Sequence, residues 1–306
     1  MKIQTIHTKN LRWIDITDPG VEEIAWLKAR FKFAALHYEA AAQHQQRPRF
    51  DQGEGYDFMV LLFPVYDRAA GEIIPGEVDF FSGPRFVITI HYGQIHNLKM
   101  LFNEARTSAE SRSAIMQKGS GFLLYKILEK LLRRSYPILD HMNEDISRIE
   151  KQIFHDGGTD LLSRISLMKK NIIEFRKMMK THRYVLEKLP RQDSSYLLFP
   201  QFKLYYRDLL EYFENIWDIL EALKETADSL AETNQALTAH HTREITKAVS
   251  IFSAVVLPAT LVAFVFGIAV EDLPLRHHPH AFWIILGLMA ISSLVMYAVF
   301  KHKKWF

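Results

Sequence analysis

A polar face on the long helical stretch of residues 200–267 has the clearest chemical potential in this sequence. Asp218, Glu225 and Glu232 stand seven residues apart, and steps of seven return to the same side of an α-helix. The same face continues with further candidate lining residues: Arg243, Thr246, Val249, Ser250, Ser253, Leu257, Thr260 and Phe264. Repeated around a symmetry axis, it would form acidic rings that attract cations, then a hydroxyl-lined passage with apolar constrictions. The alternative is a solvated helix face whose hydroxyls bond to their own backbone.

The short segment 270–280 supplies a second group of candidate ligands. Carboxylates stand at Glu271 and Asp272, and imidazoles stand at His277, His278 and His280. Mg²⁺ prefers oxygen ligands and retains its waters, whereas Zn²⁺ also accepts imidazole nitrogen. These histidines are therefore candidate metal ligands. A polar loop that binds no metal is the alternative.

Two uncharged apolar runs flank this segment, at 249–269 and 281–300. About twenty residues at roughly 1.5 Å per residue cross a hydrocarbon core of about 30 Å, so both runs are expected to span a membrane. A hairpin of two spans cannot shield a polar path by itself, so transport would require several copies of the chain.

The flanking charges predict the orientation of these spans. The tail 301–306 is basic, and Arg243 and Lys247 precede the first span. The positive-inside rule then places both termini in the cytoplasm and residues 270–280 outside. The first residues have no apolar core typical of a secretory signal. We therefore expect a multi-pass protein of the plasma (inner) membrane.

Composition excludes some other classes of protein. The formal net charge is only +3, which is too weakly basic to indicate a nucleic-acid partner. The chain has no cysteine, so disulfides and thiolate metal sites are excluded. No Walker-type loop, His-Glu-x-x-His motif or nucleophile context is present, so we expect neither an enzyme nor a bound cofactor.

The region before the spans divides into two expected parts. Residues 1–118 mix strand and helix signals and predict a cytoplasmic α/β domain with a mostly antiparallel sheet. Its signals are a strand at Leu11–Ile16, a helix start at Thr17-Asp18-Pro19, an apolar run at Tyr56–Val65, and β-rich segments at Glu77–Phe81 and Arg85–His91 around a Ser82-Gly83-Pro84 turn.

Residues 119–248 predict a helical stalk. Helices are expected over 121–154 and 160–188, and a third runs from about 200 into the first span as far as Gly267. Such a long helix needs neighbours. A stripe that alternates steps of four and three predicts packing of the third helix against the other two: Ile216, Leu220, Leu223, Ala227, Leu230, Asn234, Leu237 and His241.

These features together resemble the CorA-type divalent-metal transporters, also called the two-transmembrane GxN family. The segment VLPATLVAFVFGIAVEDLP, the tail KHKKWF and the early stretch Trp13–Pro19 carry the resemblance, and Pro258 and Thr260 match a Pro-x-Thr of the family's pore helix. The resemblance implies an α+β membrane protein with a cytoplasmic α/β domain, a long stalk and two C-terminal spans. It also implies a homopentameric funnel in the lipid bilayer that carries divalent cations.

The chain departs from the family at the outer end of the first span. The family signature there is Gly-Met-Asn, whose asparagines form a ring that holds a hydrated cation, but this chain has Gly267-Ile268-Ala269. Its entrance would then rely on the Gly267 carbonyl, Glu271 and Asp272, which predicts transport of Mg²⁺, Zn²⁺ or related ions with relaxed selectivity. Arg243, at the cytoplasmic end of the candidate pore face, is a second departure from the family, which often has asparagine there. The alternative function is a non-conducting, membrane-anchored sensor or regulatory scaffold with the same fold.

Overall fold

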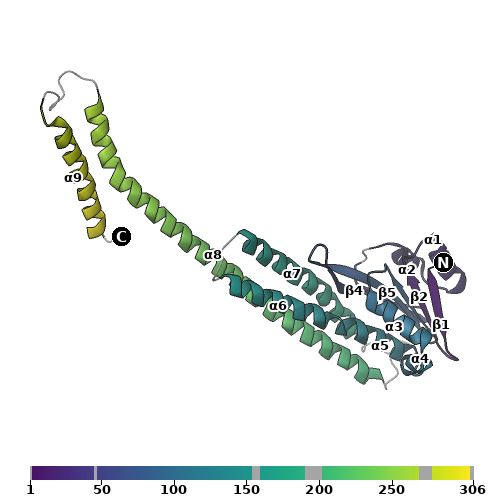
Figure 1. The fold of residues 1–306 in the computed structure, drawn as a ribbon. Helices are drawn as coiled ribbons and strands as arrows, with labels where there is room; N and C mark the ends of the chain where they lie inside the picture. Colours follow the sequence, from purple (N-terminus) through teal and green to yellow (C-terminus); the bar gives the residue numbers. More distant parts are fainter. Residues whose placement is uncertain (1, 45–46, 154–158, 190–201, 269–277, 304–306) are drawn as a thin grey trace. The chain divides into compact units, whose positions relative to one another are not determined.

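The computed structural model describes residues 2–44, 47–153, 159–189, 202–268 and 278–303 (Figure 1). The chain forms two compact units, Met1–Glu232 and Thr233–Phe306, and the longest helix contributes residues to both. The elements of the first unit up to the stalk are β1 (Ile3–His7), β2 (Arg12–Thr17), α1 (Val21–Arg30), α2 (Ala35–Ala42), β3 (Arg49–Gly53), β4 (Tyr56–Asp67), β5 (Glu72–Gly83), β6 (Phe86–His91), α3 (His96–Thr107) and α4 (Ala109–Met116).

The six strands form one sheet in the order β1-β2-β6-β5-β4-β3. Every neighbouring pair is antiparallel except β2 and β6, which run parallel. The prediction of a mostly antiparallel sheet is confirmed, and so is the hairpin that joins β5 to β6. A parallel pair needs a crossover connection. Here the chain between β2 and β6 contains α1, α2 and three further strands.

Successive side chains of a strand point to opposite faces of the sheet, and consecutive residues of these strands are apolar. Both faces of the sheet are therefore apolar, and both are covered by helices. On one face Ile14, Phe58 and Phe81 pack with residues of α1 and α2. On the other, Trp13 and Phe80 join a larger core formed with the helices that follow the sheet.

The helical part comprises α5 (Ser120–Arg133), α6 (Ser135–Ile153), α7 (Thr159–Lys188), α8 (Lys203–Gly267) and α9 (Ala281–His302). Within the first unit, α6, α7 and α8 pack side by side through residues such as Ile149, Ile165 and Leu230. The predicted stripe is buried on α8 from Ile216 to Asn234, whereas Leu237 is 41% exposed. The expected three-helix arrangement is thus confirmed for this stretch.

Two predicted helix boundaries were wrong. Helix α1 begins at Val21 rather than in the Thr17-Asp18-Pro19 stretch, because the Glu23 carboxylate accepts the backbone N–H of Gly20 at 3.1 Å and fixes the cap there. The expected helix over 121–154 is divided at Arg134 into α5 and α6.

Candidate functional site

The three predicted acidic positions are exposed on α8. Asp218, Glu225 and Glu232 are exposed, whereas the stripe that includes Ile216 and Leu220 is buried. Among the described residues, none of the three carboxylates has an ion pair. Their neighbours differ: Glu221 lies 2.7 Å from Arg176 on α7, and Asp228 lies 2.6 Å from Lys169. These three positions of α8 therefore present carboxylates that no described side chain neutralises.

In the second unit, two of the predicted hydroxyls use their protons within the helix. The Thr246 hydroxyl donates to the Thr242 carbonyl and the Thr260 hydroxyl to the Val256 carbonyl, each at 2.8 Å. A threonine that donates backwards in this way keeps its oxygen lone pairs as acceptors. Such an oxygen can still receive a hydrogen bond from water around a cation, so the two roles are compatible.

The apolar residues of the predicted face are highly exposed in a single chain. Val249 is 59% exposed, Leu257 65% and Phe264 73%. Ser250 is exposed as well, whereas Ser253 is half-buried. A hollow of about 370 Å³ lies near the end of α8 and is lined by Thr260, Ala263, Phe264, Gly267 and Ile268. Four of these five residues belong to the set that the sequence predicted, so that face is indented where the family signature stands.

The two apolar helices of this unit are joined by a hydrogen bond that the sequence reading missed. The Ser293 hydroxyl of α9 donates to the Val255 carbonyl of α8 at 3.0 Å. A hydroxyl within an apolar span was the available signal, since such groups bond across membrane helices. Each helix contains a stretch apolar enough for a membrane span, with mean hydropathy of 2.4 in α8 and 2.2 in α9.

The second predicted group of ligands is only partly within the described residues. Ala269, Glu271, Asp272 and His277 lie outside them. His278 and His280 are exposed, and the backbone N–H of His280 donates to Nδ1 of His278 at 3.2 Å. Within the ranges that the structure describes, no three His, Cys, Asp or Glu side chains gather closely enough to hold a metal ion.

Arg243 is exposed on α8. Within one chain it forms no ion pair among the described residues, and this includes the nearby carboxylates Glu232 and Glu244. Copies of the chain around an axis would therefore bring a ring of positive charge at this level, unless anions or a neighbouring copy balance it.

The early stretch Trp13–Pro19, which carried part of the resemblance, holds the sheet together. Trp13 Nε1 donates to Thr89 Oγ1 at 3.2 Å, and that hydroxyl donates to Asp15 Oδ1 at 2.5 Å. His91 Nε2 lies 3.3 Å from Asp15 Oδ2. These residues face one another because β2 and β6 are parallel and in register. Their role is structural, since all four side chains are buried.

Comparison with known proteins extends these findings over the whole chain. The YfjQ protein of Bacillus subtilis is 26% identical over 302 residues, which covers 96% of this chain and 89% of that protein. The cobalt/magnesium transport protein CorA of Thermotoga maritima is 24% identical and covers 96% of this chain and 83% of its own length.

The fold is shared with a solved structure, the complete CorA magnesium transporter of Methanocaldococcus jannaschii. That structure superposes with a TM-score of 0.79 at 20% identity, and covers 98% of this chain and 94% of its own. The sequence model of the CorA-like Mg²⁺ transporter protein family matches residues 8–302. With two apolar C-terminal helices, an α/β sheet domain and a long connecting helix, this chain belongs to the CorA-like Mg²⁺ transporter family.

Proposed function

We propose that this chain transports divalent metal cations across a membrane through an axial path in a homo-oligomer, with a pentamer as the expected assembly. Two observations on α8 carry the proposal. Exposed, unpaired carboxylates recur every seven residues in the first unit, and exposed hydroxyl and apolar residues lie in the apolar segment of the second. Membership of the CorA-like family supports it. The acidic face of the stalk would raise the local concentration of cations.

In this proposal the assembly lies in the plasma (inner) membrane with both chain termini in the cytoplasm. Residues 1–118 form the cytoplasmic α/β domain and 119–248 the stalk. The spans are 249–269 and 281–300, joined by the external segment 270–280 and followed by the cytoplasmic tail 301–306. The transported ions are substrates, and the mechanism requires no cofactor.

At the entrance, Ala269 replaces the asparagine of the family signature. Its methyl group can neither donate nor accept a hydrogen bond, so cations would be attracted mainly by the carboxylates of Glu271 and Asp272. Attraction by charge does not distinguish one hydrated divalent ion from another, so we propose weak discrimination among Mg²⁺, Zn²⁺ and Co²⁺. The histidines at 277, 278 and 280 would favour Zn²⁺ if they act as ligands.

A second candidate function is a membrane-anchored sensor or regulatory scaffold that does not conduct. Arg243 favours it, because the unpaired guanidinium lies on the same face of α8 that would line the path. A ring of guanidinium groups repels cations in a narrow path. The two candidates share one fold and one membrane arrangement, so only a measurement of flux separates them.

The test is ion uptake by purified protein in liposomes, compared for Mg²⁺, Zn²⁺, Co²⁺ and Ni²⁺. The proposal expects saturable, protein-dependent uptake of more than one of these ions. Replacing the three stalk carboxylates Asp218, Glu225 and Glu232 by Asn or Gln should lower uptake most at low ionic strength. Glu150→Gln, an exposed carboxylate on α6, is the matched control.

Native mass measurement in the same preparations tests the assembly. A monomer in lipid would contradict the axial path, because two helices cannot enclose one. An oligomer without flux of any of the four ions would instead establish the scaffold.

A further inference from the structure

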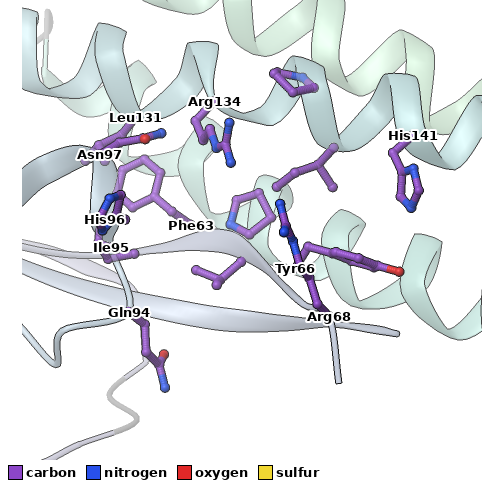
Figure 2. A pocket seen from close by; sticks show the side chains of 14 residues that line it. Phe63, Tyr66, Arg68, Gln94, Ile95, His96, Asn97, Leu131, Arg134 and His141 are labelled. Atoms are coloured by element: carbon purple, nitrogen blue, oxygen red, sulfur yellow. The ribbon is translucent and has the colours of Figure 1, made fainter. Parts of the chain in front are cut away.

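A cleft in the unit Met1–Glu232 is unrelated to the proposed ion path. It lies between the C-terminal part of β4, the start of α3 and the junction of α5 with α6 (Figure 2). Its volume is about 790 Å³. Clefts of about 300–1,000 Å³ are typical of sites for small molecules and cofactors. The cleft is therefore large enough for a ligand of nucleotide size.

The floor of the cleft is apolar and partly aromatic. Phe63, Ile95 and Leu131 are at most 5% exposed, so their side chains form a packed surface. Beside them, the ring of Tyr66 meets the ring of His141 edge-on, with centroids 5.3 Å apart. Rings and aliphatic side chains in this arrangement offer a surface on which a flat, poorly hydrated body such as a nucleobase can stack.

The rim of the cleft is cationic. Arg68 and Arg134 are exposed and extend from opposite walls, one beyond the end of β4 and one at the α5–α6 junction (Figure 2). Among the described residues neither guanidinium has an ion pair, whereas the adjacent Arg133 lies 3.1 Å from Glu129. No Asp or Glu is among the described residues that line the cleft. Within the described ranges, the one carboxylate paired with a lining residue belongs to Asp145, which is not itself part of the lining. Its Oδ2 lies 3.6 Å from Nε2 of His141.

Two helix starts add to this positive field. Helix α3 begins at His96 and α6 at Ser135, and neither has an acidic residue in its first turn. The N-terminal end of a helix carries a partial positive charge, which favours anions. The side-chain amide of Asn97, which lies beside Leu131, can hydrogen-bond a polar edge of a ligand.

We propose that this cleft binds a nucleoside triphosphate, with the base on the floor beside Tyr66 and the phosphates between Arg68 and Arg134. An inorganic anion would leave the apolar floor unused, and a hydrocarbon would leave the two guanidinium groups unpaired. A ligand with both an aromatic body and a multiply charged tail uses both surfaces. Guanidinium groups suit phosphate oxygens because their N–H groups bind in pairs.

The test is calorimetric titration of the purified full-length protein with ATP, adenosine and inorganic triphosphate, in a chelating buffer that excludes metal bridging. ATP is expected to bind at least tenfold more tightly than either fragment. Arg68→Gln and Arg134→Gln should each weaken ATP binding by about tenfold or more, since each removes a charged hydrogen-bond donor. Tyr66→Ala should weaken binding of ATP and leave inorganic triphosphate unaffected.

Arg148→Gln is the matched control, because Arg148 is an exposed arginine of α6 that pairs with Glu144 and Asp145 outside the lining. The Arg148→Gln protein should bind ATP with the same affinity as the unaltered protein. Absence of saturable ATP binding overturns the proposal. Equal loss in Arg148→Gln, or equal affinity for ATP and inorganic triphosphate, overturns it as well, because the attraction is then general charge. The titration measures ATP binding and not ion flux. A negative result therefore contradicts the ATP site without contradicting the proposed transport function.

Discussion

The imidazole Nε2 of His182 on α7 lies 2.7 Å from the carbonyl oxygen of Leu62 on β4. This contact joins the helical part to the sheet across 120 residues of sequence. His182 is 1% exposed, and its ring packs edge-on against Phe63 with centroids 4.8 Å apart. Burial lowers the pKa of His182 from 6.5 to about 4, so at neutral pH the ring is uncharged and donates its one proton to the carbonyl.

This lowered pKa predicts acid sensitivity of the α7–sheet contact. The unfolded chain binds a proton near pH 6.5 and the folded chain only near pH 4, so stability is complete above 6.5 and is lost as pH falls through this window. A difference of this size corresponds to about 3 kcal/mol. Amide hydrogen exchange in β4 and α7 should accelerate between these pH values. His182→Gln should flatten the dependence, whereas His7→Gln, at an exposed position, should preserve it.

The buried Asp79 on β5 predicts the opposite pH dependence of stability. It is 1% exposed, and neither carboxylate oxygen has a hydrogen-bond partner among the described residues. Burial and the nearby Glu77 carboxylate raise its pKa well above 3.8, although Arg49 opposes them. The folded chain therefore retains this proton at higher pH than the unfolded chain. Stability from this group is greatest below pH 3.8 and declines as pH rises toward the folded pKa.

Replacing this carboxyl tests that sign. Asp79→Asn should raise the free energy of unfolding at neutral pH by about 1–3 kcal/mol, because it removes a buried group that is poorly satisfied when charged. The gain should shrink at low pH, where Asp79 is protonated. Asp51→Asn should instead lower the free energy of unfolding at neutral pH, because Asp51 lies 3.4 Å from Arg49 and 3.5 Å from His37. Thermal unfolding of both variants across pH would contradict this account if Asp79→Asn destabilised at every pH.

Some elements could be predicted from the sequence because their signals are local. The two apolar spans follow from length and absence of charge, and the β5–β6 hairpin follows from Ser82-Gly83-Pro84 between β-rich runs. The division between α5 and α6 was missed because Arg134 is no helix breaker. Pro137 in the first turn of α6 was the available signal, since proline is favoured there.

Features built from distant segments could not be predicted. The cleft combines residues of β4, the start of α3 and the α5–α6 junction, and no periodicity relates Arg68 to Arg134. The ring contact of Tyr66 with His141 and the bond of His182 to Leu62 have the same origin, since each depends on how helices dock onto the sheet. The polar face of α8 lies on one helix, and its spacing was therefore readable.

The Ser293–Val255 bond predicts a measurable link between α8 and α9. Ser293→Ala should destabilise the pairing of the two helices by about 0.6 kcal/mol, the average for such bonds between membrane helices. Ser292→Ala is a close control, because the Ser292 hydroxyl donates to Met289 of its own helix at 2.9 Å. Thermal unfolding in detergent should separate the two variants. Equal stability of both would show that Ser293 has no role in pairing the helices.

Restoring the family signature should alter selectivity. In Ala269→Asn, an amide would return to the entrance and could hydrogen-bond the waters of a hydrated ion. Uptake in liposomes should then shift in favour of Mg²⁺ over Zn²⁺, because Mg²⁺ retains its waters most strongly. Ala281→Asn, at the first residue of α9, should leave the ratio unchanged. Identical ion ratios in Ala269→Asn and the unaltered protein would exclude the entrance as the selective element.

Leu257 is our candidate for the gate, because it is 65% exposed on the apolar part of the predicted face. A ring of leucine side chains in a narrow path expels water and blocks ions without a charged barrier. Leu257→Ser should rehydrate that point and raise leak of divalent ions severalfold in the absence of any activating condition. Leu294→Ser on α9, where Leu294 is 70% exposed, is the matched control and should leave the leak unchanged. If both variants assemble normally and leak equally, Leu257 faces lipid or another helix rather than the path.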